Sequence, residues 1–442
     1  MTASLKVGMI SLGCNKNRVD SETALGLLGS HGYSFTGDPA EADILMVNTC
    51  GFIESAKEES IDAIFEMAQY KKTGKCRLLV VTGCLAQRYE DSLMQEIPEI
   101  DLLMGVNQYA ELPAAIARAL QGERASYCRD THEYYAHDRI LTTPHYTAYT
   151  RIGEGCSNRC TFCAIPLIRG PYRSRPMQDV LDEIEALAKQ GVREHILVAQ
   201  DTTRFGTDWQ EHSALPELLQ KAAAIEGVDW LRVLYCYPDE TDDRLLDVIA
   251  NTPNICKYLD LPIQHVNDVV LRRMHRRGKK ADIMRCIRGA RERGLTLRTS
   301  IIVGFPGETE EQFEELLDVL REAEFDRLGA FAYSPEEDTP AARLPDQIPE
   351  EVKQQRLDRL MTMQAEISLK RNQARVGTVE KVLVTDAGED GFLLGRSHRE
   401  APETDGEIVF TPAKGAGLPV IGSFVNVRIT RADTYDLMGE ML

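Results

Sequence analysis

The sequence has no long hydrophobic run, because none of its stretches reaches the roughly 18 consecutive apolar residues of a transmembrane helix. The first 16 residues also lack the basic segment, apolar run and small-residue cleavage site of a secretory signal. We therefore predict a cytoplasmic protein that does not bind a membrane. There is no low-complexity tract and no simple repeat, and 442 residues are enough for two or three folded domains.

Positive charge is scarce as well. The chain has 51 Lys and Arg against 69 Asp and Glu, which gives a net charge of -18. A surface of this sign repels phosphate backbones, so nucleic acid is not the preferred partner. We expect a basic protein instead.

Disulfide bonds are not expected either. A cytoplasmic protein keeps its thiols reduced, and the eleven cysteines cannot all pair because their number is odd. Some of these thiols should bind metal.

Short apolar runs alternate with helical patterns in the first part of the chain, which predicts an α/β domain with a parallel sheet over residues 1–122. Polar, irregular sequence then predicts a linker over residues 123–144. The predicted strands are 7–12, 44–47, 78–82 and 101–104, and the predicted helices are 17–32, 54–70 and 112–120.

The alternation resumes over residues 145–376, where six βα repeats are too few for a closed eight-stranded barrel. We predict an open, partial (βα)6 barrel, with a long charged helix over residues 349–375 leading out of it. Its predicted strands are 150–153, 196–199, 231–235, 258–263, 297–303 and 328–332, and its main predicted helices are 177–190, 242–249, 281–293 and 309–322.

The last part of the chain, residues 377–442, changes to short strands interrupted by Gly, Pro and Asp. This pattern predicts a small five-stranded all-β barrel of OB type. Four of its strands are assigned, at 379–385, 392–395, 407–410 and 423–430.

Three cysteines, Cys156, Cys160 and Cys163, stand four and three residues apart just after the first strand of the predicted barrel. A loop of this length can surround one compact cluster. Three thiolates leave one iron of a 4Fe-4S cube without a protein ligand, whereas electron-transfer clusters normally have four cysteines. The trio therefore predicts a cluster with an open iron, where a cofactor or substrate can bind.

Two other interpretations of this trio are open. Structural zinc sites favour two closely spaced cysteine pairs or a fourth Cys or His, and no second pair lies nearby. The cysteines could also be unliganded loop residues. However, the pattern Cys-x3-Cys-x-Phe-Cys at the mouth of a partial βα barrel resembles the radical S-adenosylmethionine superfamily. That resemblance implies that S-adenosylmethionine binds the open iron and that its cleavage generates a radical that removes hydrogen from the substrate.

Three further cysteines, Cys14, Cys50 and Cys84, each follow one of the first three predicted strands. Ligand sites in open α/β sheets lie beyond the carboxyl ends of the strands, so these thiols could converge there. Their spacing fits a second three-thiolate site and three unrelated loop cysteines equally well. The other five cysteines are scattered and receive no role: Cys76, Cys128, Cys236, Cys256 and Cys286.

An N-terminal domain with such a trio, then a radical core, then a small β-barrel resembles the methylthiotransferase family over nearly the whole chain. The resemblance implies a second 4Fe-4S cluster on Cys14, Cys50 and Cys84, with an open iron for the sulfur that is inserted. It implies that S-adenosylmethionine acts both as methyl donor and as radical source, and that the terminal barrel is of the TRAM type. An electron donor and a sulfur source are also implied.

Polar residues at the ends of barrel strands are candidates for binding S-adenosylmethionine. By resemblance to the superfamily, we assign this role to Gln200, Arg298 and Gly304. Simple turn formation explains Gly304 nearly as well.

Three arginines, Arg169, Arg173 and Arg175, follow the barrel cysteines closely. Arginine binds carboxylates with two parallel hydrogen bonds, so one interpretation is carboxylate recognition. The other is a solvated basic loop.

Members of the methylthiotransferase family modify either an adenosine of transfer RNA or an aspartate of small-subunit ribosomal protein number twelve. Residues 377–442 hold 11 Asp and Glu against 6 Lys and Arg, a net charge of -5, which is unsuited to RNA. Residues 11–17, 163–166 and 200–203 also resemble the ribosomal-protein branch. We therefore expect β-methylthiolation of an aspartate. The alternatives are the transfer-RNA enzyme and a non-catalytic iron-sulfur or zinc protein that binds ribosomal components.

Overall fold

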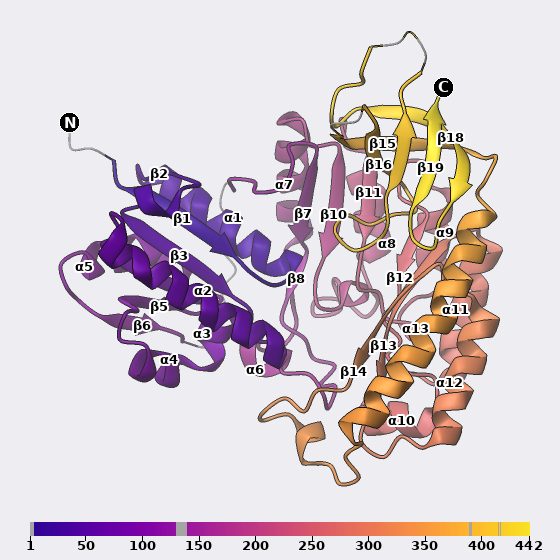
Figure 1. Ribbon diagram of the computed structural model, residues 1–442, viewed down its shortest axis with the longest axis horizontal. Coiled ribbons are helices and arrows are strands. Elements are labelled where there is room, and N and C mark those ends of the chain that lie inside the picture. Colours follow the sequence, from indigo (N-terminus) through magenta and orange to yellow (C-terminus); the bar gives the residue numbers. More distant parts are fainter. Residues whose placement is uncertain (1–3, 130–138, 389–390, 414, 416) are drawn as a thin grey trace.

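The computed structural model describes residues 4–129, 139–388, 391–413, 415 and 417–442. They form an N-terminal α/β domain, a central barrel of parallel strands and a C-terminal β-barrel (Figure 1). The N-terminal domain stands beside the central barrel, and the C-terminal barrel sits at one end of it. The predicted fold class is confirmed. The middle of the predicted linker, residues 130–138, lies outside the described residues.

The N-terminal domain is a six-stranded, wholly parallel sheet in the order β2-β1-β3-β4-β5-β6. Its strands are β1 (Lys6–Ser11), β2 (Ser34–Phe35), β3 (Ile44–Thr49), β4 (Leu78–Gly83), β5 (Leu102–Met104) and β6 (Ala125–Tyr127). Its helices are α1 (Asn15–Ser30), α2 (Glu54–Thr73), α3 (Cys84–Arg88), α4 (Glu90–Glu96) and α5 (Leu112–Ala119), with the 3-10 turns η1 (Pro39–Glu41) and η2 (Tyr109–Glu111). Strands β3 and β4 are buried along their whole length, which explains their unbroken apolar sequence.

Two apolar cores lie on the two faces of this sheet. Helices α1 and α5 pack on one face, and α2, α3 and α4 pack on the other. Strand β6 was not predicted, because the segment was interpreted as irregular; it is only three residues long and pairs with β5 at the edge of the sheet.

The central domain contains six parallel strands in two three-stranded sheets, β11-β10-β7 and β12-β13-β14, joined by a bridge between Leu231 and Ile255. This is the expected partial (βα)6 barrel. The strands are β7 (Thr147–Arg151), β10 (Glu194–Val198), β11 (Trp230–Val233), β12 (Tyr258–Asp260), β13 (Thr296–Val303) and β14 (Arg327–Ala332). A short hairpin-like pair, β8 (Gly153–Glu154) and β9 (Arg173–Ser174), brackets the cysteine loop.

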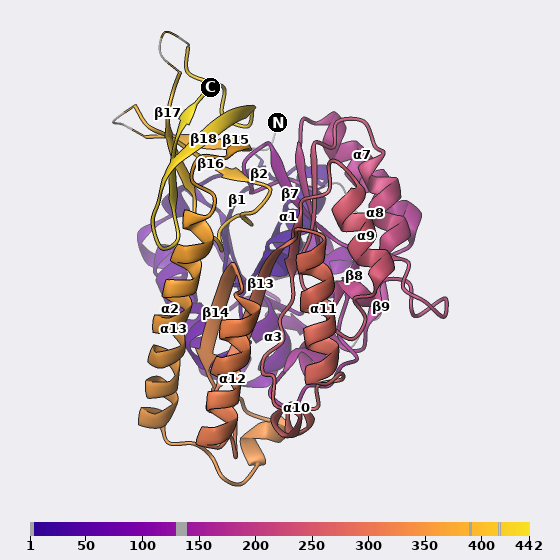
Figure 2. The same cartoon turned by 90° about the vertical axis from the view of Figure 1, so that its right-hand side faces the viewer.

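Helices cover the outside of the barrel, as Figure 2 shows for α7, α8, α9, α11 and α12. The helices are α6 (Ile165–Arg169), α7 (Met177–Lys189), α8 (Leu215–Ala223), α9 (Asp243–Asn251), α10 (Asp268–Arg273), α11 (Lys280–Glu292), α12 (Glu310–Ala323) and α13 (Glu350–Gln373), with the 3-10 turns η3 (Thr202–Arg204) and η4 (Pro340–Arg343). Helix α12 begins with a capping box, because the Thr309 hydroxyl accepts from the Gln312 N–H and the Gln312 amide oxygen accepts from the Thr309 N–H.

Helix α13 leads to the C-terminal module, a closed barrel in the order β15-β16-β17-β19-β18. Its strands are β15 (Val379–Ala387), β16 (Leu393–Ser397), β17 (Ile408–Thr411), β18 (Phe424–Ala432) and β19 (Leu437–Met441). One apolar cluster joins the three parts of the molecule, since it contains Val19 of α1, Ile196 of β10 and Leu383 of β15.

None of the helices in the described part of the chain combines the length and apolar character that crossing a bilayer requires.

Candidate functional site

The first cysteine trio lies in the loop between β8 and α6. The Cys156 N–H donates to the Gly170 carbonyl at 3.0 Å, and the Cys163 N–H donates to the Cys160 carbonyl at 3.1 Å. Gly155 has a φ of +71°, and a Cβ there would lie 2.2 Å from the carbonyl oxygen of Pro171. Only glycine fits this close approach, which folds the loop back on itself.

The environment of this trio is buried. Burial raises the pKa of Cys156 to about 11, and burial together with the neighbouring Cys160 raises the pKa of Cys163. The Arg276 guanidinium is 3.9 Å from the Cys160 sulfur, and the Tyr237 hydroxyl is 4.0 Å from the same atom. Thiols with pKa values this high stay protonated near neutral pH unless a cation such as iron binds the sulfur and stabilises the thiolate.

The second trio lies at the carboxyl ends of three adjacent strands. Cys14 precedes α1, Cys50 follows β3, and Cys84 is the first residue of α3 directly after β4. A Cβ on Gly13 would lie 2.9 Å from the Cβ of Cys50, so the first two loops touch. Burial raises the pKa of Cys84 to about 12, with Cys14 and Cys50 adding to the shift. The structure therefore places the three cysteines next to one another at the carboxyl ends of strands β1, β3 and β4.

The two trios are joined by Arg169, which comes six residues after Cys163. Its Nη2 lies 3.5 Å from the Cys84 sulfur and donates to Asp20 at 2.7 Å, and its Nη1 donates to Glu154 at 3.2 Å. Cys84 also packs in one apolar cluster with Ala164 and Ile168 of the barrel loop. The segment after the first trio thus lies directly on the second.

The loop of three arginines is not a solvated basic loop. Arg169 and Arg175 are each 2 % exposed, and Arg175 binds Glu183 at 2.6 Å. These two arginines do bind carboxylates, but the carboxylates belong to side chains of the same chain. Although burial opposes ionisation of Glu154, Arg169 and Arg151 hold its pKa down at about 2.

The candidates for binding S-adenosylmethionine have different surroundings. The buried side-chain oxygen of Gln200 has no hydrogen-bond partner among the described residues. Gly304 has a φ of +72°, and a Cβ there would lie 2.4 Å from Lys353 Cγ, so helix packing already requires glycine. Arg298 lies near the start of β13, not at its carboxyl end as expected, and it binds Asp260 at 2.8 Å. Their role as cofactor contacts stays a prediction.

Comparison with known proteins places the three parts of the chain in known families. Residues 150–320 match the Radical SAM superfamily, residues 6–105 match the uncharacterized protein family UPF0004, and residues 376–442 match the TRAM domain. "Ribosomal protein uS12 methylthiotransferase RimO" of Desulforamulus reducens is 50% identical over 98% of this chain and 99% of that protein. The proteins with the same name from Geobacter sulfurreducens and Clostridium botulinum are 47% and 48% identical, over 100% and 98% of this chain and 99% and 98% of their own.

The chain belongs to the RimO family of methylthiotransferases. As a RimO-family protein it is a radical S-adenosylmethionine enzyme that uses iron-sulfur chemistry. Among solved structures, the radical S-adenosylmethionine methyltransferase TsrM from Kitasatospora setae, with cobalamin and a [4Fe-4S] cluster bound, is similar in fold, with a TM-score of 0.56 at 14% identity over 86% of this chain and 81% of that one.

The residues of this RimO-family chain fit iron-sulfur clusters. Each trio offers three thiols on tightly folded, glycine-containing loops, with an arginine beside one sulfur. In the described residues, no three His, Cys, Asp or Glu side chains form a group that could hold a single metal ion.

Sequence reasoning missed two residues that hold the RimO cysteine loops. Asp201 is buried, accepts a hydrogen bond from Asn158 in the first loop at 2.8 Å and has a pKa raised by burial. Asn17 donates to the carbonyls of Leu12 and Thr49, at 3.0 and 2.9 Å, and so ties the first two loops of the second trio together. Both lie in motifs that the sequence analysis singled out, but their partners are far away in sequence.

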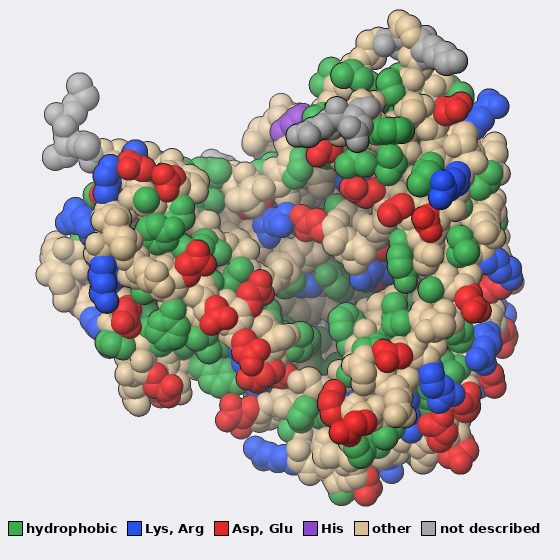
Figure 3. All heavy atoms as spheres, in the orientation of Figure 1, with side chains coloured by type: hydrophobic (Ala, Val, Ile, Leu, Met, Phe, Trp, Pro, Cys, Tyr) green, Lys and Arg blue, Asp and Glu red, His purple; other side chains and the backbone are tan. Residues whose placement is uncertain are grey.

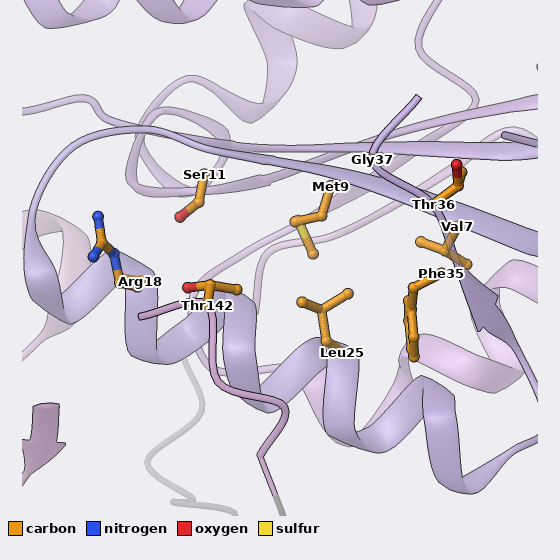
Figure 4. A pocket seen from close by; sticks show the side chains of 9 residues that line it. All are labelled: Val7, Met9, Ser11, Arg18, Leu25, Phe35, Thr36, Gly37 and Thr142. Atoms are coloured by element: carbon orange, nitrogen blue, oxygen red, sulfur yellow. The ribbon is translucent and has the colours of Figure 1, made fainter. Parts of the chain in front are cut away.

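A cavity of about 440 Å³ lies apart from both trios (Figure 4). It runs between β1 and α1 and is lined by Met9, Leu25 and Thr142, with Arg18 at one end. None of the six cysteines lines it. Figure 3 shows that the molecular surface is also hollowed between the N-terminal domain and the central barrel.

Proposed function

We propose that this protein adds a methylthio group to the β-carbon of an aspartate in ribosomal protein uS12, using two 4Fe-4S clusters. The observation that carries the proposal is that the segment directly after the first trio packs on Cys84 of the second trio, through Arg169 and through the apolar cluster of Cys84 with Ala164. The names of the similar proteins support uS12 as the substrate.

In this proposal Cys156, Cys160 and Cys163 hold the cluster that binds S-adenosylmethionine, with Gln200, Arg298 and Gly304 as candidate contacts to the cofactor. Cys14, Cys50 and Cys84 hold the second cluster. When bound, the clusters and S-adenosylmethionine supply the radical chemistry that breaks the C–H bond and the methylated sulfur that replaces the hydrogen.

The residues of the chain position these groups. Arg169 fixes the second trio against the barrel loop, and Asp201 fixes the first trio through Asn158. Because Arg169 and its carboxylate partners Asp20 and Glu154 are buried and hydrogen-bonded, they can hold the two sites at one distance and orientation, which transfer between them requires.

The C-terminal barrel suits a basic protein partner, although less of its negative charge is free than its composition indicates. Glu380 and Glu400 are buried and pair with Arg375. In the described part of the module the exposed acids are Asp386, Glu403, Glu407, Asp433, Asp436 and Glu440, of which Glu403 pairs with Arg18. These side chains can attract the basic surface of a ribosomal protein.

Mass spectrometry of ribosomal proteins and transfer RNA, from cells with and without this gene, tests the proposal. We expect the methylthio group on a uS12 aspartate to disappear in the deletion strain and to return with the wild-type gene. Loss of a methylthio group from transfer-RNA adenosine, with uS12 unchanged, would show that the substrate is RNA.

A further inference from the structure

Lys16 is a buried cation that has no acidic partner among the described residues. The residue is 8 % exposed, and its ammonium lies 3.4 Å from the centroid of the Tyr235 ring. No hydrogen bond or ion pair to Nζ exists within the described residues. A cation–π contact compensates only part of the cost of burying a charge that has no counter-ion. The site is therefore electrostatically incomplete.

Three other cations near this site are paired with carboxylates, whereas Arg276 lies over the Tyr237 ring and beside the Cys160 sulfur. Arg18 binds Glu403 at 2.5 Å, Arg298 binds Asp260 at 2.8 Å, and Arg151 pairs with Asp20. Lys16 differs from the three paired cations because the one contact of its ammonium in the described residues is the Tyr235 ring.

The ring beneath Lys16 is held in an unusual backbone conformation. Tyr235 has a φ of +63°, which is costly for a bulky residue and persists only where the surroundings impose it. Its N–H donates to Asp260 at 2.9 Å, and its carbonyl accepts from the Thr202 N–H at 3.1 Å. Hydrogen bonds to both backbone groups of Tyr235 therefore hold this residue, and with it the ring, in place.

Asn15 adds a second unsatisfied group beside the cation. Its Nδ2 donates to the Tyr235 hydroxyl at 3.3 Å, but its buried Oδ1 has no partner in the described part of the chain. Within the described residues, a donor and an acceptor that both lack hydrogen-bond partners therefore come from adjacent residues that contact the same tyrosine. Such a pair is the expected lining of a polar binding site.

The Lys16–Tyr235 contact joins two segments, one of which carries a cysteine of the second trio while the other touches a cysteine of the first. Lys16 comes two residues after Cys14, and Tyr235 comes two residues before Tyr237, whose hydroxyl is 4.0 Å from the Cys160 sulfur. A carbon that must lose hydrogen at one site and gain sulfur from the other has to lie in this region.

We propose that the Lys16 ammonium, supported by the Tyr235 ring, binds the side-chain carboxylate of the target aspartate. The inference rests on the proposed function and names the residue that selects the acidic side chain. The acidic exterior attracts a basic protein, and the Lys16 ammonium then selects an acidic side chain of that protein. The unpartnered Asn15 oxygen is placed to accept a backbone N–H of the same peptide.

The test compares two synthetic uS12 peptides, one with the target aspartate and one with asparagine in its place, for binding to the cluster-loaded full-length protein. We expect the wild type to bind the aspartate peptide at least tenfold more tightly. In Lys16→Met the ratio of the two affinities should fall to about one, chiefly because the aspartate peptide binds more weakly. Lys16→Arg should retain most of the wild-type ratio. Lys381→Met is the matched control, because that ammonium lies 4.1 Å from the Phe424 ring in the C-terminal barrel; it should leave the preference unchanged.

The carboxylate of S-adenosylmethionine is the other possible source of the anion, so cofactor binding is measured on the same samples. Reduced cofactor affinity with the peptide preference intact would assign Lys16 to the cofactor and overturn the inference. An equal loss for both peptides would show a purely structural role and also overturn it. If Lys16→Met does not fold, Lys16→Gln provides the same comparison. If the wild type binds neither peptide, the proposed function itself is wrong.

Discussion

The Nη2 atom of Arg169 lies 3.5 Å from the sulfur of Cys84, although one residue belongs to the radical barrel and the other to the N-terminal domain. The same guanidinium binds Asp20 of the N-terminal domain and Glu154 of the barrel. One buried arginine therefore couples the position of the two cysteine trios.

Replacing this arginine should disconnect the trios. Arg169→Met leaves Asp20 and Glu154 buried with less positive charge, and breaking a buried pair from one side typically costs about 3–5 kcal/mol. We expect a loss of that order in the free energy of unfolding of the cluster-free protein, measured in denaturant. The control Arg321→Met removes an exposed pair with Asp318 and should cost less than about 0.5 kcal/mol. Similar small losses in both variants would contradict the coupling role.

Acid should weaken the contact between the central domain and the C-terminal barrel. Burial opposes ionisation of Glu194, but Arg396 and Arg232 lower its pKa to about 2. Because the folded pKa lies below the unfolded one, this stabilisation is present above about pH 4.5 and is lost as the pH falls toward 2. The shift corresponds to roughly 3 kcal/mol.

Glu194→Gln removes the titrating group and isolates this effect. Between pH 4.5 and 2, its free energy of unfolding should fall by about 3 kcal/mol less than that of the wild type. Parallel curves for the two proteins would contradict the assignment.

Gln200 should contribute to cofactor binding, since its side-chain oxygen is buried without a partner in the described residues. We expect Gln200→Leu to weaken S-adenosylmethionine binding about tenfold, which corresponds to about 1.4 kcal/mol. Gln210→Leu is the control, because that side chain is exposed and its amide donates to the His212 carbonyl. Unchanged affinity in Gln200→Leu would remove this residue from the site.

The sequence was sufficient to predict the alternation of strands and helices and the position of each cysteine after a strand, because these are local patterns. It was not sufficient for contacts between distant segments. Asn15 and Tyr235 are 220 positions apart, and nothing local indicates that one side chain donates to the other. The same holds for Arg169 and Arg175: their charge is evident from the sequence, but nothing in the sequence shows that they are buried against Asp20 and Glu183. The short strand β6 was missed because three residues carry too little periodicity.

The most direct measurement of the central claim is iron content together with reductive cleavage of S-adenosylmethionine, in anaerobically reconstituted wild type, Cys156→Ala and Cys14→Ala. Cys286→Ala serves as the control for a buried cysteine outside both trios. We predict two clusters in the wild type and control, and half that iron in each of the two trio variants. Cofactor cleavage should be lost in Cys156→Ala and retained in Cys14→Ala. Full iron content in either trio variant, or cleavage that persists without Cys156, would contradict the account.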